Sequence, residues 1–351
     1  MVYVGMDSIL IRKEYGMDLM EQLRERAKAN PQKVAFFEGT NPKMMETVGE
    51  LAKAELAECF LVGDGAELAR VAEEVGADLS NVTIIDVTDA EANEAFAERF
   101  EVIPDCPFRA KGVRRRAKRA MDRALMMQRI GDTDITFGGI DCSTGDVIIG
   151  GQTIVGLADG VDTISSLGIF NIPGWEGSEG SLLGFGDAAV CVDPDPEQLA
   201  SIAISAAETV QALMGWEPRV AMLSYSTDGS AEGPLVDKVR AAVKVAQERR
   251  PDLKIDGEFQ LDTAIRPEIA AKKVRRESEV AGKANVLICP DINVGNIGVK
   301  LVQNFAHADA YGHMLQGFKK IVCDCSRSAP VSELVGNVVM SCVRSQALKE
   351  A

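Results

Sequence analysis

The sequence has no apolar run of the 18 or so residues that a membrane-spanning helix needs. The long uncharged stretch at 163–175 is interrupted by Ser, Gly, Asn and Pro. Near the N-terminus, Asp7 and Arg12 come too early to leave room for the apolar core of a signal peptide. We therefore expect a protein of the cytoplasm with no membrane partner.

Closely paired cysteines and histidines are scarce. None of the eight cysteines forms a Cys-x-x-Cys pair, which is typical of reduced thiols rather than of a disulfide framework. His307 and His313 are the only histidines, so a histidine-rich metal site is not expected. We predict no bound metal.

Positive charge is in deficit, because 38 Lys and Arg stand against 53 Asp and Glu, a net charge of −15. A chain this acidic disfavours nucleic acid as a partner. Its 46% hydrophobic and 26% charged residues exclude a wholly disordered chain. Its 351 residues are enough for two domains of about 150 residues each.

Short apolar runs alternate with helical patterns along most of the chain. The strand candidates are 34–38, 59–63, 82–86, 188–192, 220–224, 284–289 and 320–323. The helix candidates are 41–57, 65–76, 197–214, 232–248, 294–306 and 331–347. This alternation predicts an α/β fold with two mainly parallel sheets. The Gly-rich region 138–186 is predicted to be irregular, as an inter-domain crossing or a site loop.

Three polar loops follow strand candidates, at 224–229, 289–296 and 324–330. Ligands of open α/β sheets bind beyond the carboxyl ends of strands, and the N-terminus of the following helix favours anions. The same Ser, Asn and Asp residues are also good helix caps, so capping alone remains an alternative for any one loop.

The last of these loops contains Ser326 and Arg327, and Glu333 follows in the first turn of the next predicted helix. Arginine binds phosphate through two hydrogen bonds, and a serine hydroxyl can donate to a phosphate or a carbonyl oxygen. A glutamate there can serve as a general base, or it can simply favour the helix dipole. The spacing leaves both interpretations of Glu333 open.

The C-terminal half resembles the phosphate acetyltransferase and phosphate butyryltransferase family. The matching segments are 217–231, 256–262, 280–298, 300–303, 315–317 and 324–327, with looser matches at 193–200 and 17–63. The resemblance implies two α/β/α domains with an active-site cleft between them, and a homodimer. We place one domain at 1–158 plus 326–351 and the other at 159–325.

The resemblance also implies an activity, which is exchange of a short acyl group between coenzyme A and inorganic phosphate by direct thiolate attack. Coenzyme A is then a substrate, and no bound cofactor is implied. Ser326 and Arg327 match the family residues that hold the phosphate and the acyl carbonyl. The remaining matches in the cleft are the hydroxyl pair Ser143 and Thr144, together with Asn296 and Lys300.

Three positions depart from the family pattern. Glu333 replaces the aspartate general base, and Ile149 and Asn304 replace two arginines. Loss of two guanidinium groups from a dianion site costs several kcal/mol unless other cations replace them. The alternatives are therefore a different acyl substrate, or a catalytically reduced protein that binds coenzyme A or acts as a scaffold.

A basic stretch offers replacement cations, because residues 109–123 contain eight Lys and Arg residues and one Asp. The family's Lys-Gly pair aligns with Lys111-Gly112, so Arg109 and Lys111 are predicted to bind the phosphate. Some of the basic residues at 114–119 are predicted to meet the phosphates of coenzyme A. The alternative is a solvated helix face paired with acidic neighbours.

The sequence leaves two other mechanisms open. Cys142 and Cys325 directly precede Ser143 and Ser326, so an acyl-cysteine intermediate is possible if a cation lowers the thiol pKa. A nicotinamide-dependent dehydrogenase on a related fold is a further hypothesis, but no Gly-x-Gly-x-x-Gly follows a strand candidate.

Overall fold

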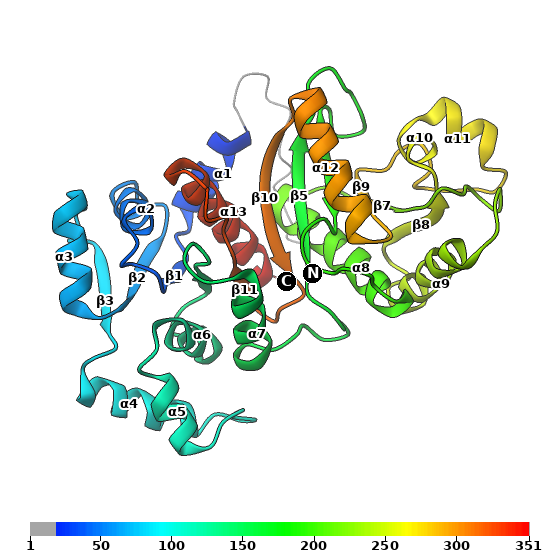
Figure 1. Ribbon diagram of the computed structural model, residues 1–351. Coiled ribbons are helices and arrows are strands. Elements are labelled where there is room, and N and C mark those ends of the chain that lie inside the picture. The colour runs from blue at the N-terminus through cyan, green and yellow to red at the C-terminus, as the bar shows by residue number, and fades with distance from the viewer. Residues whose placement is uncertain (1–18, 351) are drawn as a thin grey trace, which may run out of the picture. The chain divides into compact units, whose positions relative to one another are not determined.

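The computed structural model describes residues 19–350, which form two compact units (Figure 1). The first unit contains residues 23–164 and 312–350, and the second contains residues 165–311 together with 19–22. Asp7 and Arg12 lie outside the described residues. No helix in the described part of the chain is long and apolar enough to cross a membrane.

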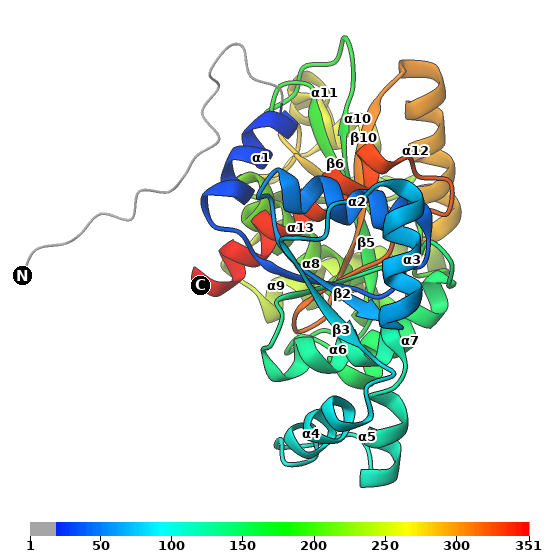
Figure 2. The ribbon, with the colours of Figure 1, turned by 90° about the vertical axis from the view of Figure 1, so that its left-hand side faces the viewer.

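The first unit is built on a parallel five-stranded sheet in the order β11-β4-β1-β2-β3. Its strands are β1 (Lys33–Phe36), β2 (Glu58–Gly63), β3 (Val82–Asp86), β4 (Ile135–Phe137) and β11 (Ile321–Cys323). Its helices are α2 (Pro42–Lys53), α3 (Gly65–Val75), α4 (Ala90–Glu101), α5 (Ala110–Arg116), α6 (Ala120–Ile130), α7 (Thr144–Ile154), α13 (Val331–Glu350) and, from residue 23 onward, α1 (Leu19–Ala29). Figure 2 shows the elements of this unit from a second direction.

The core of the first unit lies along its central strands. Every residue of β4 and β11 is buried, as parallel strands covered on both faces require. The rings of Phe36 and Phe137, from neighbouring strands, lie 5.8 Å apart. These short apolar strands end at one edge of the sheet, where their polar loops begin.

The second unit has a mixed six-stranded sheet in the order β10-β5-β6-β9-β7-β8. Its strands are β5 (Ser165–Asn171), β6 (Leu182–Gly186), β7 (Arg219–Leu223), β8 (Lys254–Phe259), β9 (Val286–Ile288) and β10 (Asp309–Gln316). Its helices are α8 (Pro196–Met214), α9 (Pro234–Arg249), α10 (Leu261–Ile265), α11 (Pro267–Lys273) and α12 (Ile292–Ala306). β5 and β6 are antiparallel, whereas the β6–β9, β9–β7 and β7–β8 pairs are parallel.

The α/β class with two mainly parallel sheets is confirmed, but two predicted segments are wrong. Residues 188–192 form a loop, because the Asp187 carboxylate accepts hydrogen bonds from the backbone N–H groups of residues 189, 190 and 191 and curls the chain. The Gly-rich region 138–186 is not irregular throughout, since it contains α7, β5 and β6.

The division between the units differs from the boundaries expected at 158/159 and 325/326. The structure divides the chain at 164/165 and again inside β10, at 311/312. Residues 312–325 fall with the first unit, and within them β11 pairs with β4 in its sheet.

Candidate active site

Three loops begin side by side at the carboxyl edge of the first sheet. Phe36, Phe137 and Cys323 are in register on β1, β4 and β11, so residues 37–41, 138–143 and 324–330 leave the sheet as neighbours. This edge is where open α/β sheets bind ligands.

A buried glutamate organises this edge. Glu38, two residues after the end of β1, is 8% exposed. Its carboxylate accepts hydrogen bonds from the backbone N–H groups of residues 139, 140, 141 and 142, at 2.7–3.1 Å. The Asn41 amide donates to Asp141 at 2.9 Å. One carboxylate therefore satisfies a whole turn of backbone donors and fixes the path of the loop into α7.

The β4 and β11 loops approach closely at Gly139, which has φ +108°. A Cβ atom at this residue would lie 2.0 Å from Asp324 Oδ1 and 2.9 Å from the backbone nitrogen of Cys325. Only glycine combines that backbone conformation with that approach.

Ser143 and Thr144 begin α7. Ser143 caps the helix, and its hydroxyl donates to Asp146 Oδ2 at 2.7 Å while accepting from the Asp146 backbone N–H at 3.1 Å. Thr144 is exposed, and its hydroxyl donates to Asp324 Oδ2 at 2.5 Å. The predicted hydroxyl pair is therefore tied to two carboxylates.

Asp324 is the first residue after β11, and its surroundings are unusual for a carboxyl. Burial, with the Glu38 charge, raises the pKa of Asp324 to about 6, although Thr144, the Cys325 N–H and Arg327 act in the opposite direction. Its Oδ1 is buried and has no hydrogen-bond partner in the described part of the chain. A group held in this way can change its charge near neutral pH.

Ser326 and Arg327 are exposed in the β11 loop, as a ligand-binding role requires. Ser326 Oγ lies 3.0 Å from Ser328 Oγ. Within residues 19–350, no hydrogen bond or ion pair occupies the Arg327 guanidinium. Lys43, in the first turn of α2, donates to the carbonyl oxygen of Ala329 at 3.2 Å and adds a second cation to this edge. Glu333 is exposed in the first turn of α13.

The two cysteines beside the hydroxyl residues are not activated. Burial, reinforced by Glu38 and Asp324, raises the pKa of Cys142 to about 12. The same causes raise the pKa of Cys325 well above its ordinary value. Both thiols are therefore protonated at neutral pH, which argues against an acyl-cysteine intermediate.

The basic stretch divides into paired and unpaired residues. Arg114 pairs with Glu94 and Glu101, and Arg123 is buried over the ring of Phe96. Arg116 lies over Phe108, and Arg119 pairs with Asp122 at 3.3 Å. The interpretation as a solvated face paired with acidic neighbours therefore holds for Arg114 and Arg119, whereas Arg123 is buried.

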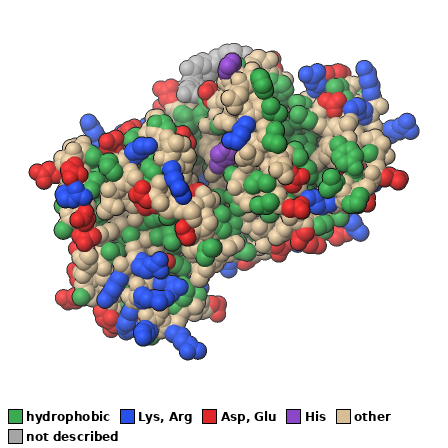
Figure 3. Space-filling view, viewed as in Figure 1, with side chains coloured by type: hydrophobic (Ala, Val, Ile, Leu, Met, Phe, Trp, Pro, Cys, Tyr) green, Lys and Arg blue, Asp and Glu red, His purple; other side chains and the backbone are tan. Residues whose placement is uncertain are grey.

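Arg109 and Lys111 are exposed at the start of α5. Basic side chains gather over α4 and α5 (Figure 3). Figures 1 and 2 place α5 at the end of the first unit opposite the loop that precedes α13. No contact in the described residues joins Arg109 or Lys111 to Ser326, so their phosphate-binding role stays a prediction.

Asn296 and Lys300 lie on α12 of the second unit. The Asn296 amide donates to the carbonyl oxygen of Ala188 at 3.2 Å, and Lys300 is exposed. Ile149 on α7 is 65% exposed, and Asn304 on α12 donates to the carbonyl oxygen of Lys300. The two positions that lack the family arginines are therefore solvent-facing.

The second unit has an apolar pocket of about 360 Å³ at the carboxyl edge of its sheet. Its lining comes from two loops predicted to bind ligands and from the neighbouring helices: Phe185, Leu223, Ser224, Tyr225, Leu235, Leu261, Cys289, Pro290, Asp291, Val294 and Gly298. This size falls within the range of small-molecule sites, but the apolar lining differs from the anion site expected for these loops.

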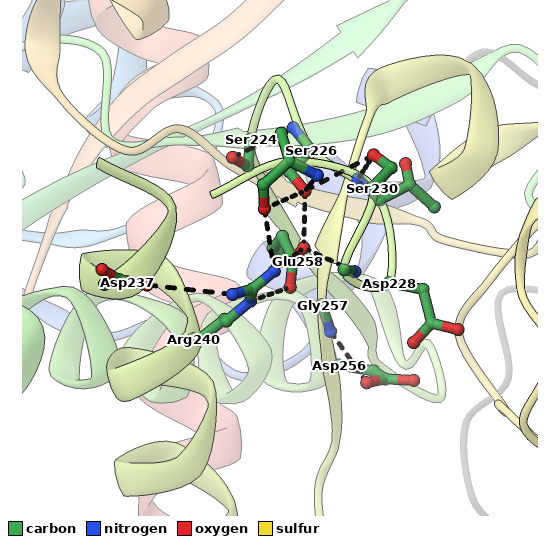
Figure 4. A network of polar contacts seen from close by, with 12 residues as sticks. Ser224, Ser226, Asp228, Ser230, Asp237, Arg240, Asp256, Gly257 and Glu258 are labelled. Atoms are coloured by element: carbon green, nitrogen blue, oxygen red, sulfur yellow. Dashed lines mark hydrogen bonds and ion pairs between the residues drawn. The ribbon is translucent and has the colours of Figure 1, made fainter. Parts of the chain in front are cut away.

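A polar network holds the loop that follows β7 (Figure 4). Glu258 accepts hydrogen bonds from the Ser226 hydroxyl at 2.8 Å and the Gly229 N–H at 3.1 Å, and pairs with Arg240 at 3.0 Å. Burial by itself would raise the pKa of Glu258, but Arg240 and these hydrogen bonds lower it to about 2. Glu258 therefore stays ionised and fixes the loop that carries Ser224 and Tyr225.

The sequence pattern alone does not identify Glu38, Lys43 and Asp324 as parts of the site. Glu38 ends a strand candidate, Asp324 follows one and Lys43 lies at the start of a helix candidate, so their positions were available as a signal. What the sequence does not give is the pairing of β1, β4 and β11, which brings the three residues to one edge.

Fold and site together define an α/β protein with a polar ligand site at a sheet edge. A family model described as phosphate acetyl/butaryl transferase matches residues 18–342. A phosphate acetyltransferase from Clostridium acetobutylicum is 40% identical over 335 residues, which cover 94% of this chain and 99% of that protein. One from Thermoanaerobacterium thermosaccharolyticum is 38% identical over 331 residues, covering 94% of this chain and 100% of that protein.

Among solved structures, the EutD phosphotransacetylase from Staphylococcus aureus is similar, with a TM-score of 0.84 and 30% identity over 94% of this chain and 98% of that one. The chain belongs to the phosphate acetyl/butaryl transferase family. It is accordingly an acyltransferase, and the resemblance seen in the sequence is confirmed.

Proposed function

We propose that this enzyme exchanges a short acyl group, with acetyl as the first candidate, between coenzyme A and inorganic phosphate. Family membership along nearly the whole chain carries the proposal, since residues 18–342 match the family model. The reaction joins acyl-CoA and phosphate to give acyl phosphate and coenzyme A, and it runs in both directions. Small molecules are then its partners, and the cytoplasm is its proposed location.

In the chemistry proposed, the thiolate of coenzyme A attacks the acyl carbonyl carbon. The C–S bond forms, the C–O bond to phosphate breaks, and the phosphate leaves with the electron pair. Arg327 and Ser326 hold the phosphate and the carbonyl oxygen, where negative charge develops. The exposed Arg327 guanidinium supports this role, because no acidic side chain of the described residues occupies it. Lys43 adds positive charge close by.

The remaining roles rest on the family pattern. Glu333 stands at the position of the family's general base and is exposed. In that pattern Ser143 and Thr144 face Ser326 and Arg327, and Asn296 and Lys300 of the second unit are further candidates for contact with the substrates. Arg109 and Lys111 supply further cations for phosphate groups.

Coenzyme A is the proposed acyl carrier, used as a substrate and not held as a bound cofactor. The apolar pocket of about 360 Å³ in the second unit supports this, since it offers Tyr225 and Leu261 to an apolar or planar part of such a ligand.

We also propose that the enzyme is a homodimer. Val294, Ile297, Leu301 and Phe305 recur at helical spacing along α12 and are 45–81% exposed. Hydrophobic side chains are visible over this helix in Figure 3. Sedimentation should give a dimer, and replacing Leu301 and Phe305 together by Glu should give a folded monomer. A monomeric wild-type protein would contradict the proposal.

The activity is tested by mixing the pure protein with phosphate and acetyl-CoA, propionyl-CoA or butyryl-CoA and measuring free thiol. We expect release of coenzyme A with at least one of these. Binding of coenzyme A without turnover of any would favour the catalytically reduced alternative. In that case, Ile149→Arg with Asn304→Arg should raise activity, since both positions face solvent.

A further inference from the structure

The hydroxyl pair at the start of α7 does not offer protons to a ligand. Thr144 Oγ1 donates to Asp324 Oδ2 at 2.5 Å, and Ser143 Oγ donates to Asp146 Oδ2 at 2.7 Å. A hydroxyl has one proton and two acceptor lone pairs. While these carboxylates are ionised, both hydroxyl oxygens therefore present only lone pairs to a ligand. Such lone pairs accept a hydrogen bond from a donor group of the ligand, whereas the oxygens of a phosphate are themselves acceptors.

Thr144 is the member of this pair that can act on a substrate. It is exposed, whereas the Asp324 side chain behind it is partly buried. Ser143 differs, because its hydroxyl also accepts from the Asp146 N–H and closes a helix-capping box. In the proposed reaction, the donor that must lose a proton is the thiol of coenzyme A.

We propose that Asp324 orients the Thr144 hydroxyl as a hydrogen-bond acceptor for the thiol of coenzyme A and receives the thiol proton through it. This inference rests on the proposed function. Asp324 is then a positioning residue that acts through Thr144, and it takes over the role that the family pattern gives to Glu333.

The proton movements balance. As the C–S bond forms, the S–H bond breaks and its proton passes to Thr144 Oγ1, while the Thr144 proton passes to Asp324 Oδ2. The C–O bond to phosphate breaks, and phosphate leaves with the electron pair. The proton then returns through Thr144 to the phosphate, so the products are acyl-CoA and hydrogen phosphate.

The surroundings of Asp324 suit this exchange. The groups that face its carboxyl are the Thr144 hydroxyl, the Cys325 backbone N–H, the negative charge of Glu38 and the positive charge of Arg327, with the Cys142, Cys323 and Cys325 thiols nearby. Burial and Glu38 raise the pKa of Asp324 to about 6, so the carboxyl is ionised at pH 7.5 yet can hold a proton transiently. Its second oxygen, Oδ1, has no competing hydrogen-bond donor in the described residues.

Steady-state kinetics with coenzyme A and acetyl phosphate, from pH 5 to 8.5, test the inference. Thr144→Ala and Asp324→Asn should each lower kcat about 100-fold and change the KM for acetyl phosphate little. Thr144→Ser should keep most of the activity, and the double variant should be no slower than either single variant. Wild-type kcat should fall below pH 6, and Asp324→Asn should lack that fall.

Thr153→Ala is the matched control, because Thr153 lies on the same helix and its hydroxyl bonds only the Ile149 carbonyl. Thr144 is exposed, so its variants report on the inference even if Asp324→Asn fails to fold. Retained kcat with a raised KM for acetyl phosphate in Thr144→Ala would overturn the inference. The inference would also be overturned if Glu333→Gln lacked the fall in kcat below pH 6 while Asp324→Asn kept it. An inactive wild-type protein would instead remove the proposed function itself.

Discussion

Glu38 Oε2 lies 2.7 Å from the backbone nitrogen of Gly139, so a carboxylate in the loop that follows β1 holds the loop that follows β4. The two residues are 101 positions apart in the sequence. Their contact links the first strand of the sheet to the loop that delivers Ser143 and Thr144 to the candidate site.

Replacing Glu38 by Gln should therefore destabilise the protein and lower turnover. A glutamine has one acceptor oxygen, so part of the set of four backbone donors loses its partner, at about 1–3 kcal/mol for each buried group. Urea unfolding measures this loss. Glu73→Gln, on the exposed face of α3, is the matched control and should stay within about 0.5 kcal/mol of wild type. Equal midpoints for the two variants would refute the role of Glu38.

Gly139→Ala should disrupt the same edge from the other side. The added Cβ would meet Asp324 Oδ1 at 2.0 Å, and the backbone has φ +108°, so the β4 and β11 loops must separate. We expect a loss of about 1–3 kcal/mol in the free energy of unfolding and a large loss of turnover. Gly145→Ala is the control, since its nearest neighbour would be Ser143 Oγ at 3.6 Å. Wild-type turnover in Gly139→Ala would contradict the packing described.

The sequence predicts the strands and loops of this edge well, but it does not predict which strands pair with one another. The apolar runs at 34–38 and 320–323 correspond to β1 and β11, and Ser326 and Arg327 lie in the exposed loop expected for them. β4 was missed because it has only three residues and leads into Gly138 and Gly139, which read as loop. Without β4, nothing in the sequence connects Glu38 to residues 139–142 or Thr144 to Asp324.

The roles of the charged residues are also harder to predict from the sequence than the positions of the strands and loops. The basic run at 109–123 allows both phosphate-binding cations and a solvated face, and Glu94 and Glu101 of α4 and Asp122 of α6 neutralise part of it. This pairing depends on the packing of α4 against α5. Conversely, Lys43 is an isolated basic residue in the sequence, yet it reaches Ala329. Composition counts charges without placing them.

The stability of the folded chain should depend on pH through Asp324. Its pKa is about 6 in the folded chain and about 3.9 in an unfolded one, so the folded state holds this proton more tightly. Its contribution is therefore fully present below about pH 4 and lost as the pH rises through 6. The free energy of unfolding of Asp324→Asn, relative to wild type, should rise by about 1 kcal/mol from pH 4 to 7, with allowance for solvent screening. A constant difference across that range would contradict the assignment.

Arg327→Gln should lower kcat about 100-fold and leave the unfolding midpoint unchanged, because the exposed guanidinium makes no contact that stabilises the described fold. Arg70→Gln is the control and should keep wild-type turnover of acyl phosphate, because this exposed arginine on α3 pairs with Glu67 and Glu74 of its own helix. If both variants behave alike, Arg327 has no special part in the reaction.

Cys142→Ser and Cys325→Ser should each keep turnover within a few-fold of wild type. Burial raises the pKa of both thiols, so neither supplies a thiolate at neutral pH. Slow alkylation of the native protein by iodoacetamide at pH 7 should accompany this result. Loss of turnover in a folded Cys142→Ser protein, together with fast alkylation of Cys142, would revive the acyl-cysteine mechanism.

The most direct test of acyl transfer by thiolate attack is the exchange of isotopically labelled phosphate into acetyl phosphate, measured with and without coenzyme A. Direct attack predicts exchange only when coenzyme A is present, since phosphate is released only as acyl-CoA forms. Exchange without coenzyme A would show an acyl-enzyme and contradict the mechanism. No exchange even with coenzyme A, in a folded protein, would contradict the proposed activity.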